Sequence, residues 1–493
     1  MDDTHTTRTR HSVARRRFIQ AAGTGVVASF AGCSGDSDGG GGVTTSPGTS
    51  NGTKPPRNKF EGETIKIGVL GPLPQENPLG KSMANSAKLA AKYIRDQEQE
   101  ADSDFLEQYV EGSIDRAALA KNYHYKYEHM LGADIEVVVG NTEATPATAK
   151  QEYLRLTSEE NVDLTVGVFF SSVINGLMDL IAQQGVPHFT TGAAAPQPAR
   201  LVSQEYEKYK YHFRVGPFNS VALAKAQLEF IDLYADQLGW NKVGVLVEDI
   251  ADLKPFHDYL KGRIGKHIDT PVIKVTSSGQ TNWTPIYDDL ESAGVDVALV
   301  GLALTGQSAA KQWADQQRPF EFGGIHVFSQ FPGFWEDLSG KARYIFTMNS
   351  VTPQTENTQF TQPLMKAYNA NFDSYPVYSG PITFDAVRLF AAAIRETGTL
   401  NPDRLVNFVE SRRFEGVSTI VPFAEFTGPD AKYAHEPKFT CMSGDTCDSP
   451  IGVPLWQQWQ KGKQGEGVEG AGVMECFAPG PVKTADYQKP HWI

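Results

Sequence analysis

Two turns in the sequence carry small polar residues that could hold an anionic or carbonyl group. Ser171 and Ser172 follow the apolar run 162–169, at the point where a helical pattern begins. The segment 190–195, Thr-Thr-Gly-Ala-Ala-Ala, follows the next strand-like run in the same way. Hydroxyl groups and the free backbone N–H groups of a helix start bind such oxygens, and ligands gather beyond the carboxyl ends of parallel strands. The sequence therefore predicts a small-solute site at these turns.

Both turns also have a purely structural explanation. Serine is strongly preferred as a helix N-cap, so Ser171 and Ser172 could cap the following helix, and this role is compatible with ligand contact. The small residues 192–195 could serve close packing between a strand and a helix.

No pattern typical of an enzyme is present. The chain contains no HExxH and no Walker loop, and neither GxSxG nor GxGxxG follows a predicted strand. No pair among the 11 histidines has metal-ligand spacing on a predicted helix, and His188 lies within a predicted strand, where a structural role is expected. We therefore expect a binding protein rather than an enzyme, with no cofactor and no metal.

Cys33 ends a segment with the features of an export signal. Residues 15–17 are three arginines followed by Phe18 and Ile19, which resembles the twin-arginine pattern, and residues 30–33, Phe-Ala-Gly-Cys, resemble a lipobox. The apolar part, 18–32, is shorter than the roughly 20 residues of a membrane span. The alternatives are an uncleaved anchor and a chance basic N-terminus. We expect residues 1–33 to be a signal and a lipid on Cys33 to hold the protein on the outer face of the cell membrane.

Residues 34–60 are rich in Gly, Ser, Thr and Pro and predict a disordered tether. The net charge is −13; residues 1–33 hold two aspartates and five arginines, so their removal takes it to −16. An acidic surface disfavours a nucleic-acid partner and favours solubility. Signal and tether together resemble those of lipoproteins of salt-loving archaea.

Three cysteines remain beyond Cys33. Cys441 and Cys447 bracket a five-residue loop and are a candidate disulfide in an oxidising compartment. Zinc binding with the nearby His435 is the alternative, although the spacing matches no familiar zinc motif. Cys476 is left unpaired in this scheme.

Apolar, β-branched runs alternate with helical patterns along the body of the chain, which predicts βαβ units with right-handed crossovers and an α/β fold. The predicted strands are 64–71, 134–141, 162–169, 186–192, 211–216, 242–249, 272–277, 295–302, 324–331 and 344–350. The predicted helices are 80–97, 147–161, 220–239, 283–294, 305–317, 358–371, 380–398 and 401–413. The acidic segment 97–132 is long for a strand connection and is interpreted as an insertion.

The order of these parts resembles a known family. The segments 65–94, 144–173, 185–196, 212–231, 242–249, 295–302 and 374–398 resemble the substrate-binding proteins of branched-chain amino acid ABC transporters, which have the type I periplasmic-binding-protein fold. The resemblance implies two Rossmann-like lobes with parallel central sheets, joined by three hinge crossings near Gly216, Met348 and Phe426. It places 61–216 and 349–426 in lobe 1, 217–348 and 427–465 in lobe 2, and 466–493 in a C-terminal tail.

The resemblance also implies a function. A small polar or amino-acid-like solute would be captured between the lobes and delivered by a monomer to an ABC transporter permease; the alternative is a sensor that reports to a signalling receptor. Carried over from the family, the solute's carboxylate and amino groups would contact Ser171, Ser172, Thr191, Ala193 and Ala194, the alanines through their backbone.

This chain departs from the amino acid-binding pattern in three places. Ala195 stands where those relatives have threonine, Leu253 where they have tyrosine, and the neutral Gln330 where an acid often receives the ligand ammonium. A free amino acid is therefore in doubt as the ligand, and Gln330 is kept as a candidate contact.

Further candidates lie in the second predicted lobe. Asp249, at the end of a predicted strand, could receive a cation or cap the next turn. Phe331, Phe334 and Trp335 could stack on a flat solute or pack within their own lobe.

Overall fold

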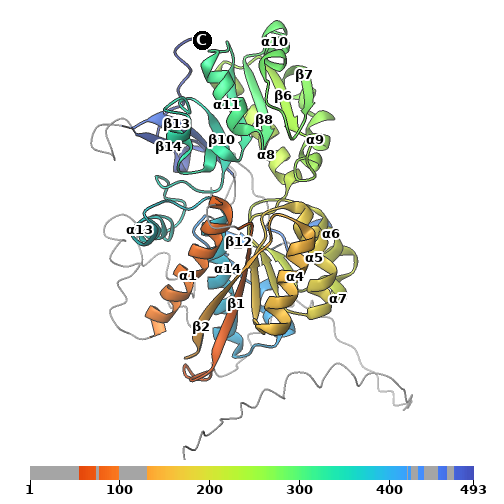
Figure 1. The fold of residues 1–493 in the computed structure, drawn as a ribbon, viewed down its shortest axis with the longest axis vertical. Coiled ribbons are helices and arrows are strands. Elements are labelled where there is room, and N and C mark those ends of the chain that lie inside the picture. The colour runs from red at the N-terminus through yellow and green to blue at the C-terminus, as the bar shows by residue number, and fades with distance from the viewer. Residues whose placement is uncertain are drawn as a thin grey trace, which may run out of the picture. The chain divides into compact units, whose positions relative to one another are not determined.

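The computed structural model describes residues 55–73, 77–98, 130–418, 420–423, 431–437, 454–462 and 471–493. The predicted signal with Cys33, nearly all of the tether, most of the insertion 97–132, the hinge at Phe426, and Cys441 and Cys447 lie outside these residues. The body, Lys54–Ile493, contains two large β-sheets, each covered by its own helices (Figure 1). Within the described part, no helix is long and apolar enough to cross a membrane.

The first sheet contains five parallel strands in the order β2-β1-β3-β4-β5. They are β1 Thr64–Gly71, β2 Asp134–Asn141, β3 Leu164–Gly167, β4 His188–Thr190 and β5 His212–Arg214. Helices α1 Pro78–Glu98 and α14 Ser379–Thr397 share a core with one face of the sheet, and α4 Pro146–Leu154 and α5 Ser171–Gln184 with the other. Cover on both faces explains why β3 is buried along its whole length.

The second sheet has seven strands in the order β14-β13-β10-β9-β8-β6-β7. They are β6 Lys242–Glu248, β7 Asp269–Thr276, β8 Val297–Leu302, β9 Glu321–His326, β10 Phe346–Asn349, β13 Leu455–Lys461 and β14 Gly472–Ala478. The first five are parallel, whereas β13 and β14 are antiparallel additions. Helices α8 Ser220–Leu238 and α9 Lys254–Lys261 share one core with this sheet, and α10 Thr284–Ser292 and α11 Gly306–Asp315 share the other.

The remaining elements connect or complete the lobes. They are the π-helical turn Arg155–Glu159, α6 Gln197–Gln204, α7 Tyr206–Tyr209, the 3-10 turns Ile264–Lys266 and Phe328–Gln330, α12 Phe334–Asp337, α13 Thr361–Phe372, α15 Pro402–Glu410, β11 Arg413–Glu415, β12 Ile420–Pro422, and the 3-10 turns Ala431–Tyr433 and Gly480–Val482. The two-lobed α/β fold expected from the sequence is thereby confirmed.

Two predicted boundaries differ from the structure. The segment 466–493, expected to be a tail, contains β14, which pairs with β13 inside the second sheet. Residues 431–437, expected in lobe 2, contact the first lobe instead: Arg214 Nε donates to Glu436 Oε1 at 2.9 Å, and the His435 ring stacks on Phe213 at 3.8 Å. The physical reason is that the Arg214 side chain is fully buried, and a buried charge requires a partner.

The buried pair lies beside the first crossing between the lobes. Asn219 caps α8 by accepting from Val221 N and Ala222 N, and its Nδ2 donates to Glu436 Oε2 at 3.1 Å. Arg214 and Asn219, which flank the crossing 215–218, thus both donate to the carboxylate of Glu436 and hold the two ends of the crossing in place.

Candidate functional site

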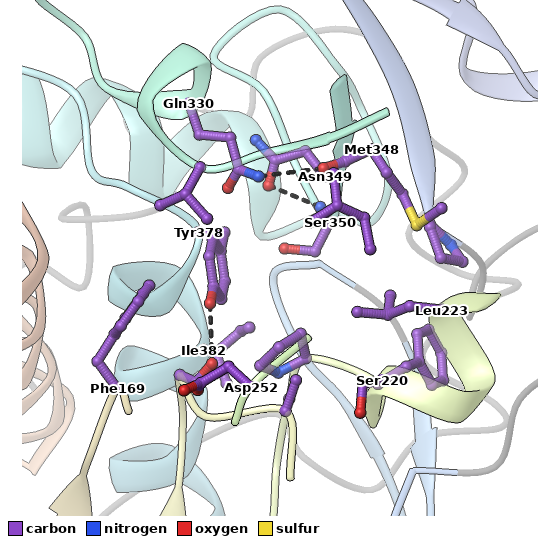
Figure 2. Close-up of a pocket in the computed structure, with 18 of the residues that line it drawn as sticks. Phe169, Ser220, Leu223, Asp252, Gln330, Met348, Asn349, Ser350, Tyr378 and Ile382 are labelled. Carbon is purple, nitrogen blue, oxygen red and sulfur yellow. Dashed lines mark hydrogen bonds between the residues drawn. The ribbon is translucent and has the colours of Figure 1, made fainter. Parts of the chain in front are cut away.

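A cavity of about 130 Å³ lies between the two sheets of the body (Figure 2). Lobe 1 contributes the turns after β3 and β4, the crossing 215–218, and Tyr378 and Ile382 at the start of α14. Lobe 2 contributes the β6–α9 loop, the end of β9, Gln330 in the turn that follows it, and residues 348–350 at the end of β10. Both groups of turns follow the carboxyl ends of parallel strands, where α/β sheets bind ligands.

The walls of the cavity are mostly apolar. Phe169 and Ile382 lie on the lobe 1 side, Met348 lies on the lobe 2 side, and Leu223 of α8 lies to the right in Figure 2. Leu253, which stands where amino acid-binding relatives have tyrosine, also lines the cavity. Apolar walls with a few convergent polar groups are typical of sites for small molecules, and they favour a solute with an apolar body.

Gln330 carries an unused hydrogen-bond acceptor on the cavity wall. Its Nε2 donates to Met348 O at 3.1 Å, which orients the amide, while its buried Oε1 has no hydrogen-bond partner among the described residues. Buried polar atoms are nearly always paired in folded proteins. The free Oε1 is therefore a place where a solute N–H or O–H group would bind.

Tyr378 joins the cavity wall to the turn after β4. Its hydroxyl donates to Gly192 O at 2.8 Å, drawn as a dashed line in Figure 2. Burial, aided by the charge of Asp252, raises the pKa of Tyr378 well above its ordinary value, so the phenol stays neutral. Gly192 is required here because a Cβ would lie 2.7 Å from Met83 Cε and 3.0 Å from Phe169 Cα. Close packing thus accounts for the glycine in this turn.

Asp252 reaches from lobe 2 to lobe 1. It lies in the β6–α9 loop, and its Oδ1 accepts a hydrogen bond from Ser171 N, at the start of α5, at 2.6 Å. Burial raises the pKa of the Asp252 carboxyl, and the hydrogen bonds from Ser171 oppose that rise. Asp249, in the same loop, is the acid that the sequence predicts; the signal for Asp252 is a second aspartate three residues later.

Among the described residues, the cavity lining contains two carboxylates and no lysine, arginine or histidine. Asp385 is balanced within lobe 1, because Arg388 Nη1 donates to its Oδ1 at 3.2 Å and Val417 N donates to its Oδ2 at 2.7 Å. Asp252 has no such basic neighbour in the lining. The electrostatic character of the cavity is therefore negative.

Two of the predicted ligand contacts, Ala194 and Gln330, line the cavity. Thr191 and Ala193 do not line the cavity. The buried Oγ1 of Thr191 is 2.7 Å from Thr383 Oγ1, and the N–H of Ala193 donates to Val168 O at 3.0 Å. These groups are used within lobe 1 and are not free for a solute.

The other predicted residues are not part of the cavity lining. The N–H of Ser171 donates to Asp252 Oδ1, and the side chain of Ser172 is exposed. Asp249 is also exposed, and its N–H donates to Thr276 O at 2.8 Å. Phe334 and Trp335 are buried in a core of lobe 2, which supports the packing role weighed for them. Phe331 is partly buried against the core of lobe 1.

The described residues supply neither a metal site nor a reactive thiol. No group of three or more His, Cys, Asp or Glu side chains among them could hold a metal ion. Cys476 is free and buried, and burial raises the pKa of its thiol to about 12, which keeps it unreactive.

Comparison with known proteins identifies the class of this two-lobed fold. The family model described as periplasmic binding protein matches residues 64–437. The chain therefore belongs to the periplasmic binding protein family. Membership implies a location outside the cytoplasm and a solute-binding role. Among curated proteins, none matches the chain.

Solved structures share the fold at low sequence identity. One is a protein assigned to a branched-chain amino acid ABC transporter from Silicibacter pomeroyi, with a TM-score of 0.66 and 16% identity, covering 87% of this chain and 100% of its own. The isoleucine complex of a branched-chain amino acid transporter substrate-binding protein from Streptococcus pneumoniae has a TM-score of 0.59 and 17% identity, covering 84% and 100%. A Rhodopseudomonas palustris ABC transporter solute-binding protein in complex with 3,4-dihydroxybenzoic acid has a TM-score of 0.59 and 16% identity, covering 87% and 99%.

Proposed function

We propose that this protein captures a small solute between its two lobes outside the cytoplasm and delivers it, unchanged, to the permease of an ABC importer. The observation that carries the proposal is the cavity enclosed by both lobes, with apolar walls and the unpaired Oε1 of Gln330. Family membership and the absence of catalytic motifs from the sequence support binding without chemistry.

The solute has an apolar body and a few polar groups. Side chains such as Phe169, Met348 and Ile382 offer contact surface, and Gln330 offers an acceptor. Amino-acid-like and small aromatic compounds fit this description, and the complexes of the relatives with isoleucine and 3,4-dihydroxybenzoic acid support the choice. Of the contacts expected from the sequence, we retain Gln330 and Ala194 as solute contacts.

A lipid on Cys33 and the tether 34–60 would keep the protein near its permease. The twin-arginine pattern and the lipobox are the sequence features that support this part of the proposal. Confinement by a flexible tether raises the effective concentration of the lobes at the membrane.

A thermal-shift screen of the purified protein against amino acids, their amides, aromatic acids and aromatic amides tests the proposal. A solute present at 100 times its Kd is expected to add about 2.7 kcal/mol to the free energy of unfolding. Gln330→Leu is expected to weaken that binding at least tenfold, because Oε1 would be lost, while exposed Ser172→Ala leaves it unchanged.

Mass spectrometry of the recovered solute separates binding from catalysis. We expect the compound to be recovered intact after long incubation with the protein. A chemically altered product, or equal affinity in the wild type and Gln330→Leu, would contradict the proposed function or the proposed site.

A further inference from the structure

The start of α5 is occupied by a carboxylate of the protein itself. Phe170, the N-cap residue of α5, provides no side-chain hydrogen bond to the helix. The N–H of Ser171 instead donates to Asp252 Oδ1 of the opposite lobe at 2.6 Å. Unpaired N–H groups and the positive end of the helix dipole make a helix start attractive to anions. Asp252 fills this position, where the sequence predicts an anionic or carbonyl group of a solute.

The surroundings of Asp252 make a second carboxylate unfavourable. Asp385 is the other charged residue of the lining, and Arg388 and Val417 N already satisfy it. No basic side chain of the described residues belongs to the lining. A solute carboxylate would therefore lie near Asp252 in a partly buried place where no described residue of the lining supplies a positive charge, and like charges repel strongly there.

The unpaired atoms of the lining favour the opposite kind of group. Gln330 Oε1 is an acceptor only, and it is buried without a partner among the described residues. The hydroxyls of Ser220, Ser350 and Ser418, also in the lining, are buried without a described partner and can accept or donate, so they serve a solute N–H group without deciding for it; Gln330 Oε1 is the group that can only accept. In Figure 2, Gln330 and Asp252 lie on opposite sides of the cavity, with Tyr378 between them. A solute with N–H groups would satisfy such acceptors.

We propose that Asp252 determines specificity: by occupying the start of α5 it selects solutes that present amide or ammonium N–H groups and rejects those that present a carboxylate at that place. This inference rests on the proposed function and names its solute class. It departs from the expectation that the turns at Ser171 and Thr191 contact the carboxylate and amino groups of a solute.

Matched pairs of compounds test the selectivity. Benzoate and benzamide, and isoleucine and isoleucinamide, have nearly the same shape and differ in the carboxylate. Calorimetric titration of the wild type is expected to show at least tenfold tighter binding of the amide in at least one pair. Asp252→Ala is expected to reduce that preference at least tenfold, because the start of α5 becomes free for the acid. Asp258→Asn, on the exposed face of α9, is the control and keeps the wild-type preference.

Several results would overturn the inference. Tighter binding of both acids by the wild type, or an unchanged preference in Asp252→Ala, would remove Asp252 from specificity. If none of the four compounds binds, the proposed solute class fails. The hydrogen bond between Ser171 and Asp252, which joins the lobes, is still tested by small-angle X-ray scattering of the solute-free protein. Asp252→Ala is expected to increase the radius of gyration, since the lobes lose the Ser171–Asp252 hydrogen bond, and an unchanged radius overturns the inference.

Discussion

His326 positions the segment that carries Gln330. Its Nε2 is 3.0 Å from Gly306 O, which can only accept, and its Nδ1 accepts from Ser329 N at 3.0 Å. The two partners fix the neutral ring with the proton on Nε2. Burial lowers the pKa of His326 to about 4. Protonation would therefore break the bond to Ser329 at the start of the turn Phe328–Gln330.

This histidine makes stability depend on pH with a definite sign. The unfolded chain binds a proton on His326 below about pH 6.5, whereas the folded protein does so only near pH 4. The stability that the folded protein gains by keeping His326 neutral is therefore complete above pH 6.5. As pH falls below 6.5, the free energy of unfolding decreases by up to about 1.4 kcal/mol per pH unit. We expect His326→Gln to show a shallower fall between pH 6.5 and 4 than the wild type, measured by urea unfolding at several pH values.

Comparison of variants isolates this histidine from other groups. Burial lowers the pKa of His188 to about 3, which adds a fall of the same sign, while burial raises the pKa of Glu415 and Glu436, which acts in the opposite direction. These effects are common to all variants. Ser329→Ala is the control, because it removes the bond from Ser329 Oγ to His326 O but keeps the imidazole. Equal slopes in the wild type and His326→Gln would contradict the prediction.

Of the residues that the sequence predicts as solute contacts, Ala194 and Gln330 line the cavity, while others, such as Asp249, lie outside its lining. The acids Glu248, Asp249 and Asp252 lie within five positions, and only the fold separates their roles. Glu248 Oε2 accepts from Ala303 N and Leu304 N, both at 2.8 Å, Asp249 is exposed, and Asp252 crosses to lobe 1. These roles depend on contacts between distant segments, which periodicity does not reveal.

The strands were the most predictable elements. Runs such as 64–71 and 134–141 match β1 and β2 residue for residue, because each run is rich in the apolar, β-branched residues that strands favour. The predicted strand 324–331 is displaced: β9 spans Glu321–His326, and residues 328–330 form a 3-10 turn fixed by His326. A lone histidine gives no sign in the sequence that it ends a strand in this way.

The segment after β14 supports β9 through one carboxylate. Glu321 is only 2% exposed, and it accepts from Trp240 Nε1 at 2.9 Å and from the Tyr487 hydroxyl at 2.5 Å. Lys489 Nζ lies 3.2 Å from its other oxygen. Two of these three donors thus come from residues that the sequence analysis assigned to a separate tail.

We expect the double variant Tyr487→Phe and Lys489→Met to lose about 2–4 kcal/mol of unfolding free energy, because a buried carboxylate would lose most of its donors. The aromatic ring and the aliphatic stem are kept, so apolar packing changes little. Urea unfolding measures the loss. Adding Glu321→Gln, which removes the charge, is expected to recover at least half of it. A double variant as stable as the wild type, or the absence of recovery, would contradict this account.

At the scale of the molecule, the order of parts predicted the two lobes, but it did not predict which lobe holds every late segment. Residues 431–437 contact the first lobe through Glu436 and His435, and β13 begins the return to the second sheet at Leu455. The sequence shows only that 431–437 contains a histidine and a glutamate. Their partners, Arg214 and Phe213, are more than 200 residues away.

The tether and the lobes are expected to act independently. Cys33→Ala is expected to release the protein from the membrane fraction, because the acyl chains would have no attachment, and to leave solute affinity within twofold. Fractionation of cells followed by calorimetric titration measures both quantities. Retention of the variant in membranes would argue against the lipid anchor, and a large loss of affinity would argue against independence.

The interleaving of the two lobes along the chain governs how the protein is made. The first sheet uses strands up to Arg214, but its buried helix α14 begins at Ser379, after β6–β10 of the other sheet. The second sheet is in turn incomplete until β13 and β14, within 455–478, have been translated. During synthesis on the ribosome, an apolar face of each lobe therefore stays uncovered until residues much later in the chain have been translated. Both lobes can reach their native packing only near the end of translation.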